Sequence, residues 1–266
     1  MAMDRRKFLK IAGLSAALGL GGKTALDLLT PGEVEASFEK APLMQGKKWG
    51  MVVDMNKMTE EIMDKCIAAC HNVHNVPDLG NPKEEIKWIW KETYEHTFPG
   101  QHHEYVAEQY HGRNFLLLCN HCTNPPCCRV CPTKATWKRE DGVVMMDQHR
   151  CIGCRFCMAA CPYGVRSFNW GDPRNAPKDR NPNFPPNMEY PTRSKGVVEK
   201  CNFCAERLAK GQLPACVEAA DAIEKNALTF GDLDDANSEV RHLLHSHYTI
   251  RRKSELGTGP NVYYIV

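Results

Sequence analysis

The chain has 266 residues, with 34 Lys and Arg against 32 Asp and Glu, and it contains 14 cysteines. The formal net charge of +2 gives no sign of a nucleic-acid-binding surface. A chain of this length can bury an ordinary hydrophobic core, whereas disulfide scaffolds are mostly much shorter, so the cysteines call for another chemistry.

The N-terminus indicates export. Residues 5–9 are Arg-Arg-Lys-Phe-Leu and precede the short apolar stretch 11–20, an order typical of a twin-arginine (Tat) signal. Glycines interrupt that stretch, so we expect it not to span a bilayer. The small-residue site Val34-Glu35-Ala36 predicts a signal peptide over 1–36 and a mature domain over 37–266, folded before export and acting at the periplasmic face of the cytoplasmic membrane.

The first cysteine run is incomplete. Cys66 and Cys70 have the three-residue spacing that ends a ferredoxin run, but the two earlier positions of that spacing hold Glu60 and Met63. Cys66 to His71 also matches a stretched form of the haem attachment signature C-x-x-C-H. The extra residue in the signature weighs against haem. Haem attachment would also take Cys70 away from a cluster that needs it as a ligand.

Two strands are expected before the second run. Residues 86–91 alternate apolar and polar side chains and include Trp88 and Trp90, which favours a strand with the tryptophans in the core or at an interface. Residues 114–118 form a short apolar segment that leads directly into cysteines. We expect that segment to be a strand as well.

The second and third runs are complete. The third follows the pattern C-x2-C-x2-C-x3-C-P, and the second has two extra residues before its third cysteine. In bacterial ferredoxins the first three thiolates of such a run bind one [4Fe–4S] cluster and the fourth binds the neighbouring cluster. Zinc is the main alternative, because paired C-x2-C knuckles bind it, but a four-thiolate zinc site needs only two such pairs. Gly153 would let the backbone approach a cluster closely.

The segments around these runs indicate connections. Asp141-Gly142 lies between strand-like halves of residues 136–147, which predicts a hairpin. Residues 171–191 are rich in proline and asparagine and predict a long irregular loop, either a surface connector or a docking element. The apolar tail 254–266 is expected to pack on the body or on another subunit.

The fourth run has three cysteines, with Ala220 where a fourth is expected. If runs one and four exchange ligands as runs two and three do, three clusters are complete. The fourth site retains only Cys66, so we expect it to be empty and to lie at one end of the row. Cys66 and Cys128 are left over. The predicted ligands are Cys70, Cys201, Cys204 and Cys216 for cluster one; Cys119, Cys122, Cys127 and Cys161 for cluster two; and Cys131, Cys151, Cys154 and Cys157 for cluster three.

The cysteine runs, the leader and the stretch 227–238 resemble the four-cluster ferredoxin subunits of the polysulfide, dimethyl sulfoxide and nitrite reductase families. The resemblance covers residues from about 47 to the C-terminus. It implies an α+β fold of two interleaved bacterial ferredoxin-like modules with long loop insertions. As in such modules, we expect each cysteine run to be a loop feeding a short helix, with strands between the runs. Within that family, the leader and the missing cluster are most similar to the outward-facing iron–sulfur subunit of the membrane complex that accompanies dissimilatory sulfite reductase. The implied modules are 112–170 for runs two and three, 47–111 with 195–235 for runs one and four, and a tail over 236–266.

No nucleophile–base pair, phosphate-binding loop or substrate signature is visible in the sequence, and iron bound wholly by thiolates has no open coordination position. We therefore expect a non-catalytic electron-transfer subunit with three [4Fe–4S] clusters, in a quinone-linked membrane respiratory complex of sulfur metabolism. The expected partners are a multi-span quinone-reactive membrane subunit and a second redox subunit such as a multihaem cytochrome c. The alternatives are the electron-transfer subunit of an exported molybdopterin reductase and a zinc-binding interaction module.

Overall fold

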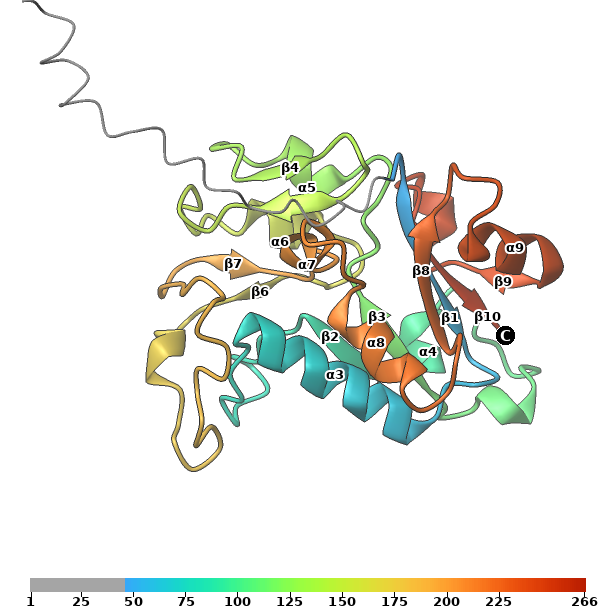
Figure 1. The fold of residues 1–266 in the computed structure, drawn as a ribbon, viewed down its shortest axis with the longest axis horizontal. Coiled ribbons are helices and arrows are strands. Elements are labelled where there is room, and N and C mark those ends of the chain that lie inside the picture. The colour runs from blue at the N-terminus through green and yellow to red at the C-terminus, as the bar shows by residue number, and fades with distance from the viewer. Residues whose placement is uncertain (1–45) are drawn as a thin grey trace, which may run out of the picture. The chain divides into compact units, whose positions relative to one another are not determined.

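The structure is a computed structural model that describes residues 46–266. The predicted signal peptide, residues 1–36, lies outside the described residues. The described residues, 46–266, group as one compact unit, and the elements below all belong to it (Figure 1). None of the helices in the described part has both the length and the apolar character that a membrane span requires.

A four-stranded sheet stands on one side of the molecule, with strand order β8-β1-β10-β9 (Figure 1). Strand β1 is antiparallel to β8 and parallel to β10, and every residue of β1 is buried. Helix α9 packs against β8 and β1. The bounds are β1 Trp49–Asp54, β8 Leu228–Asp232, β9 Thr249–Ile250, β10 Val262–Ile265 and α9 Glu239–Ser246.

The C-terminal tail is part of this sheet. We predicted that residues 254–266 pack on the body or on another subunit, and the packing on the body is confirmed, since β10 is an interior strand between β1 and β9. The Tyr264 hydroxyl donates to the Leu116 carbonyl at 3.0 Å, so the tail also contacts the neighbouring hairpin. The short 3₁₀ turn η3, Ser254–Leu256, precedes the strand.

The first cysteine run is a continuous helix, α3 (Glu60–His74), and our expectation of a loop feeding a short helix is wrong there. The side chain of Thr59 caps the first turn by accepting from the Ile62 N–H, and Asn75 ends the helix in the left-handed conformation. Glutamates in the first turn complement the helix dipole. Helix α3 packs along α8 (Ala215–Asp221), which carries the end of the fourth run.

The predicted hairpin and the two strands predicted before the second run are present. Strand β3, Asn114–Leu118, has the predicted bounds and pairs antiparallel with β2, Ile89–Thr93. Strand β2 begins three residues later than predicted, because the Trp88 indole turns to donate to the buried Glu199 carboxylate at 2.9 Å. Strands β4 (Thr136–Lys138) and β5 (Val144–Met146) enclose the Asp141-Gly142 turn, where Gly142 has φ 83°.

The other runs do end in short helices, as predicted. Residues 171–191 contain one 3₁₀ turn and are otherwise irregular, which confirms the predicted loop; it joins the paired strands β6 and β7. The remaining elements are α4 Tyr94–Thr97, η1 Glu108–Tyr110, α5 Pro126–Arg129, α6 Phe156–Ala160, β6 Ser167–Phe168, η2 Pro173–Asn175, β7 Val198–Glu199 and α7 Ala205–Leu208.

Candidate iron–sulfur centres

Four thiols of the second predicted set surround one small cavity, which we call site two. The cavity has an empty volume of about 320 Å³, and Tyr163 and Arg166 contribute to its wall. Strand β3 delivers the first two cysteines, and helices α5 and α6 deliver the others. The structure therefore brings together cysteines from two different runs, as the exchange rule requires. The four are Cys119, Cys122, Cys127 and Cys161.

The third predicted set surrounds a second cavity, site three, with an empty volume of about 270 Å³. This site is the nearest of the three to solvent, since Cys154 is exposed. Gly153 has φ 70°, and a Cβ there would lie 2.4 Å from the Gly196 carbonyl oxygen. Glycine is thus required at position 153 by the neighbouring Gly196 backbone. This reason adds to the predicted close approach of the Gly153 backbone to a cluster. The lining cysteines are Cys131, Cys151, Cys154 and Cys157.

The first predicted set, site one, is the most enclosed. Its four thiols are all buried and come from α3, the turn before α7, and α8. Burial raises the pKa of Cys70 well above its usual value, and the nearby thiols of the other three add to that rise. Burial also raises the pKa of Cys201 to about 12. Such thiols stay protonated until a metal ion displaces the proton. The set is Cys70, Cys201, Cys204 and Cys216.

The C-x2-C loops that open the second, third and fourth cysteine runs share a backbone feature. The residue before the second cysteine has positive φ in each loop: His121 at 40°, Gly153 at 70° and Phe203 at 56°. This conformation is unfavourable for side chains with a Cβ, so the two non-glycine residues must be held by packing. They hold each other, because the His121 and Phe203 rings stack with centroids 3.7 Å apart. The stack joins the loop of site two to the loop of site one.

The sites follow one another in the order three, two, one. At each step a thiol of one site is close enough to affect the pKa of a thiol in the next. Beyond site one comes Cys66, whose Sγ donates to the Cys216 carbonyl at 3.2 Å. The adjoining pairs are Cys157 and Cys127, Cys119 and Cys201, and Cys216 and Cys66.

Protein side chains fill the position of the degenerate fourth site. Met63, Cys66 and Ala220 are buried where α3 packs on α8. Glu60 instead faces outward, where its carboxylate accepts from the Lys91 ammonium at 2.8 Å. That hydrogen bond lowers the pKa of Glu60. The four positions of this set thus hold one thiol, and three of them are buried in the contact between α3 and α8.

The two cysteines left over in the sequence have hydrogen-bonding roles. Cys66 donates to a carbonyl, as described, and burial raises the pKa of its thiol to about 12. The neighbouring Cys128 thiol lowers the pKa of Cys127. All 14 cysteines are free thiols.

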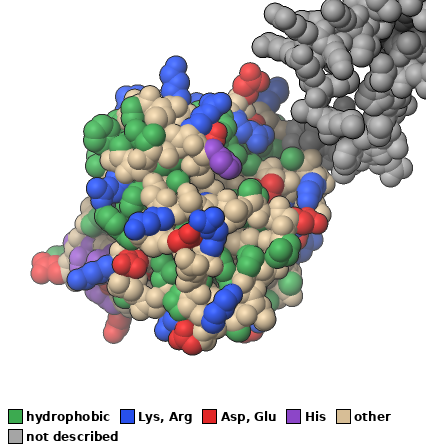
Figure 2. Space-filling view, turned by 90° about the vertical axis from the view of Figure 1, so that its left-hand side faces the viewer, with side chains coloured by type: hydrophobic (Ala, Val, Ile, Leu, Met, Phe, Trp, Pro, Cys, Tyr) green, Lys and Arg blue, Asp and Glu red, His purple; other side chains and the backbone are tan. Residues whose placement is uncertain are grey.

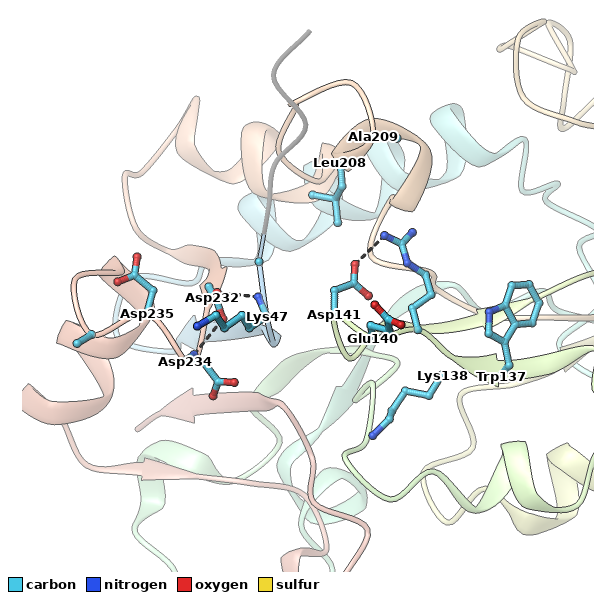
Figure 3. A pocket seen from close by; sticks show the side chains of 13 residues that line it. Lys47, Trp137, Lys138, Glu140, Asp141, Leu208, Ala209, Asp232, Asp234 and Asp235 are labelled. Carbon is cyan, nitrogen blue, oxygen red and sulfur yellow. Dashed lines mark hydrogen bonds and ion pairs between the residues drawn. The ribbon is translucent and has the colours of Figure 1, made fainter. Parts of the chain in front are cut away.

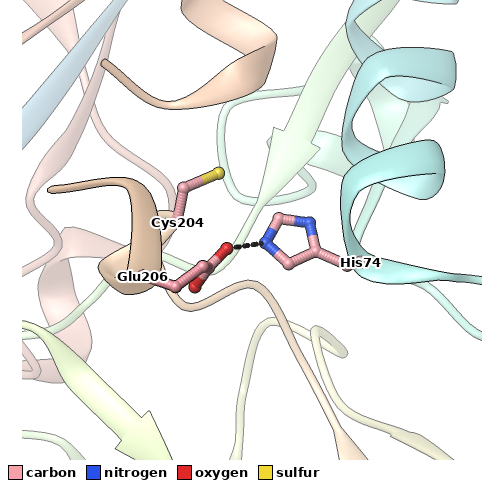
Figure 4. Close-up of side chains that lie close together, drawn as sticks. All are labelled: His74, Cys204 and Glu206. Atoms are coloured by element: carbon pink, nitrogen blue, oxygen red, sulfur yellow. Dashed lines mark hydrogen bonds and ion pairs between the residues drawn. The ribbon is translucent and has the colours of Figure 1, made fainter. Parts of the chain in front are cut away.

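A buried histidine adjoins site one, and no sequence pattern predicted it. The His74 Nδ1 lies 2.8 Å from the Cys70 carbonyl, and its Nε2 lies 2.8 Å from a Glu206 carboxylate oxygen (Figure 4). Both ring nitrogens thus face acceptor oxygens. Ligand atoms of His74, Cys204 and Glu206 lie within 4.8 Å of one another. Because Cys204 belongs to the thiol set of site one, the other two residues form a polar wall beside that site.

Two buried cations were also missed. Arg166 lies beside sites two and three, and Lys200 lies beside sites two and one; neither stands in a recognised motif. Lys200 follows the segment Val197–Glu199, which has two apolar residues and then a glutamate. Two charged residues in succession, Glu199 and Lys200, are not expected in a buried strand. The placement of a lysine directly before Cys201 was the available signal.

A broad hollow of the described surface has an empty volume of about 2140 Å³ and lies between the β4–β5 turn, α7 and the loop after β8 (Figure 3). In its wall Arg139 pairs with Asp141 at 2.7 Å, and Asp232 accepts from two backbone N–H groups. No cysteine lines the hollow, so it is separate from the thiol sites.

Comparison with known proteins gives the same chemistry. Residues 113–178 match the model of the 4Fe-4S dicluster domain. The chain is 38% identical to Hdr-like menaquinol oxidoreductase iron-sulfur subunit 1 of Archaeoglobus fulgidus, over 98% of this chain and 97% of that protein. It is 35% identical to the iron-sulfur cluster-binding subunit of menaquinone reductase from Nitratidesulfovibrio vulgaris, over 82% of this chain and 88% of that protein. It is 33% identical to a polysulfide reductase subunit of Wolinella succinogenes, over 82% of this chain and 94% of that protein.

The matched regions cover most of each relative and most of this chain, so the similarity extends well beyond the matched dicluster segment. The mixed α+β architecture with paired cysteine runs agrees with that match, which confirms the predicted fold class. The chain therefore belongs to the family of 4Fe-4S dicluster electron-transfer subunits of respiratory oxidoreductases, the family of the polysulfide and dimethyl sulfoxide reductase iron–sulfur subunits.

Proposed function

We propose that the protein carries three [4Fe–4S] clusters, held by the four cysteines of site one, site two and site three, and passes electrons between two partner subunits. The observation that carries the proposal is that sites two and three are cavities each lined by all four cysteines of one exchanged set. Each set supplies only sulfur ligands, the donor type that such clusters take. A bound cluster supplies one-electron redox chemistry, and the protein supplies ligands, insulation and charge. The subunit itself is proposed to be non-catalytic.

The order of the sites supports a role in conduction. Electron tunnelling falls steeply with distance, so an empty position inside a row would interrupt transfer, while one at its end only shortens the row. The degenerate position adjoins site one through Cys66 and Cys216 and lies at an end. The proposed row is therefore three clusters without an internal gap.

Site three is the proposed contact end for a redox partner outside the membrane. Around the exposed Cys154, Ile152 and Phe156 are 67% and 59% exposed, which is unusual for large apolar side chains of one loop. The Arg155 guanidinium lies over the Phe168 and Trp170 rings, at 5.3 and 4.9 Å from their centroids. Figure 2, which views the side where β6 and β7 lie in Figure 1, shows apolar side chains exposed among Lys and Arg.

We further propose that the protein is of the DsrO type, which is the outward-facing iron–sulfur subunit of the membrane complex that accompanies dissimilatory sulfite reductase. It would work at the periplasmic face of the membrane in sulfur metabolism. The twin-arginine leader and the degenerate fourth site support this assignment. The names of two relatives, a menaquinol oxidoreductase subunit and a menaquinone reductase subunit, support a quinone-linked complex. Its proposed partners are a multi-span quinone-reactive membrane subunit and a second redox subunit such as a multihaem cytochrome c.

The test is reduction of the clusters by quinol in the intact complex. We expect a menaquinol analogue, added anaerobically to the complete membrane complex, to produce the electron paramagnetic resonance (EPR) signals of reduced [4Fe–4S] clusters. The same quinol should not reduce this subunit after it has been separated from its membrane partner. Clusters that stay oxidised in the complete complex, yet are reducible by dithionite, would rule out the quinone-linked role.

The second candidate is the electron-transfer subunit of an exported molybdopterin reductase. The similarity to the polysulfide reductase subunit, over 94% of that protein, favours it. Proteins that co-purify with the chain separate the two functions. A molybdopterin protein indicates the second candidate, whereas a membrane quinone-reactive protein with a multihaem cytochrome indicates the first.

A further inference from the structure

Two cations are buried at the centre of the proposed row. Arg166 and Lys200 are only 4% and 2% exposed. Burying a charge in a protein interior is costly unless an opposite charge or hydrogen bonds compensate it. Within residues 46–266, neither side chain forms an ion pair with a carboxylate. Their compensation must therefore come from something other than Asp or Glu.

Arg166 is directed at the thiols of two sites. Its Nη1 donates to the Thr136 hydroxyl at 3.2 Å, but Nε and Nη2 are buried without a hydrogen-bond partner in the protein. The guanidinium adjoins Cys127 of site two and Cys157 of site three. Arg166 also lines the cavity of site two. Buried N–H groups facing a set of thiols are placed to donate to sulfur atoms in the cavity.

Lys200 also lies beside site two. Its Nζ donates to the Val144 carbonyl and to the Cys201 carbonyl, the latter at 2.7 Å. An ammonium has three N–H groups, so one remains. Its charge acts on Cys119 and Cys127, both of site two, and on Cys201 of site one.

Site one has the opposite electrostatic surroundings. A Glu206 carboxylate oxygen lies within 4.8 Å of the Cys204 Sγ. Burial raises the pKa of Cys70 and of Cys204, and the negative charge of Glu206 adds to both rises. The His74 Nε2 lies 2.8 Å from the same carboxylate. Site three has Arg166 on one side and solvent on the other, because Cys154 is exposed.

We propose that Arg166 and Lys200 are charge partners of the cluster in site two, and that this cluster has the highest reduction potential of the three and the cluster in site one the lowest. The proposal rests on the function proposed above. Reduction adds negative charge to a cluster, so an adjacent buried cation and N–H donors to sulfur stabilise the reduced form. These interactions are stronger in the interior than in water. An electron then rests at the centre of the row rather than at its two ends.

The test is a potentiometric titration of the anaerobically purified complex, followed by EPR, with Arg166→Gln, Lys200→Met and Glu206→Gln variants. We expect Arg166→Gln to lower the midpoint potentials of clusters two and three and leave cluster one unchanged. Lys200→Met should lower the midpoint potential of cluster two most and that of cluster one less. Glu206→Gln should raise the midpoint potential of cluster one. Arg139→Gln, which removes a surface cation, is the matched control and should shift none of them.

Iron content separates this inference from the proposed function. A protein with all its iron, in which Arg166→Gln shifts potentials no more than Arg139→Gln does, overturns the inference and leaves the three-cluster function standing. A wild-type protein in which cluster one has the highest potential also overturns it. If Arg166→Gln fails to retain iron, Arg166→Lys keeps the charge but loses the forked donors. A smaller downward shift in that variant supports the proposal, and no shift contradicts it.

Discussion

The degenerate fourth site predicts that Met63→Ala weakens packing without removing iron. Met63 is 2% exposed on α3, where that helix packs on α8. The change removes three methylene-sized groups, about 2.4 kcal/mol at about 0.8 kcal/mol for each. The cavity left behind adds to this, so we expect the free energy of unfolding to fall by about 2–5 kcal/mol. Iron should stay at about twelve per chain.

The assay combines iron analysis with denaturant unfolding under anaerobic conditions, followed by tryptophan fluorescence. Glu60→Gln is the matched control, because Glu60 is another of the four positions but lies at the surface. An exposed ion pair contributes at most about 1 kcal/mol, so this variant should unfold almost as the wild type does. About sixteen irons in the wild type, falling to about twelve in the Met63 variant, would mean that a cluster occupies the position, and the reasoning would fail.

Three further predictions follow from the contacts of single residues. Cys70→Ser should alter the EPR signal of cluster one alone, whereas Cys66→Ser should leave all three clusters unchanged; the reverse result would overturn the ligand assignment. Cys128→Ala should keep every iron, because Cys128 only adjoins Cys127, and a loss of four would make it a ligand. Tyr264→Phe leaves the buried Leu116 carbonyl without its donor, so the free energy of unfolding should fall by about 1–3 kcal/mol in denaturant titration. An unchanged value would show that the carbonyl finds another partner.

Local patterns were sufficient for the elements whose signals are local. The strand at 114–118 is a continuous apolar segment next to cysteines, and its bounds were predicted correctly. The Asp-Gly turn specified the β4–β5 hairpin for the same reason. The cysteine sets came together in the structure because their spacing reflects ligand geometry, which does not depend on the surrounding fold.

The rest depends on contacts between distant residues. The first run was expected to be a loop, but without cluster ligands at Glu60 and Met63 its backbone is free to continue as helix α3. Strand β2 was displaced because Trp88 bonds to Glu199, which is more than a hundred residues away. Lys200 could not be placed from sequence, since its position depends on the Val144 carbonyl in the β4–β5 hairpin.

The most direct measurement of the central claim is iron and zinc analysis of the anaerobically purified protein, together with EPR spin quantitation. The proposed function predicts about twelve irons per chain, three [4Fe–4S] signals on full reduction, and no stoichiometric zinc. About sixteen irons would contradict the ligand pairing and the empty fourth site. Stoichiometric zinc without iron, in a colourless protein, would contradict the electron-transfer function itself.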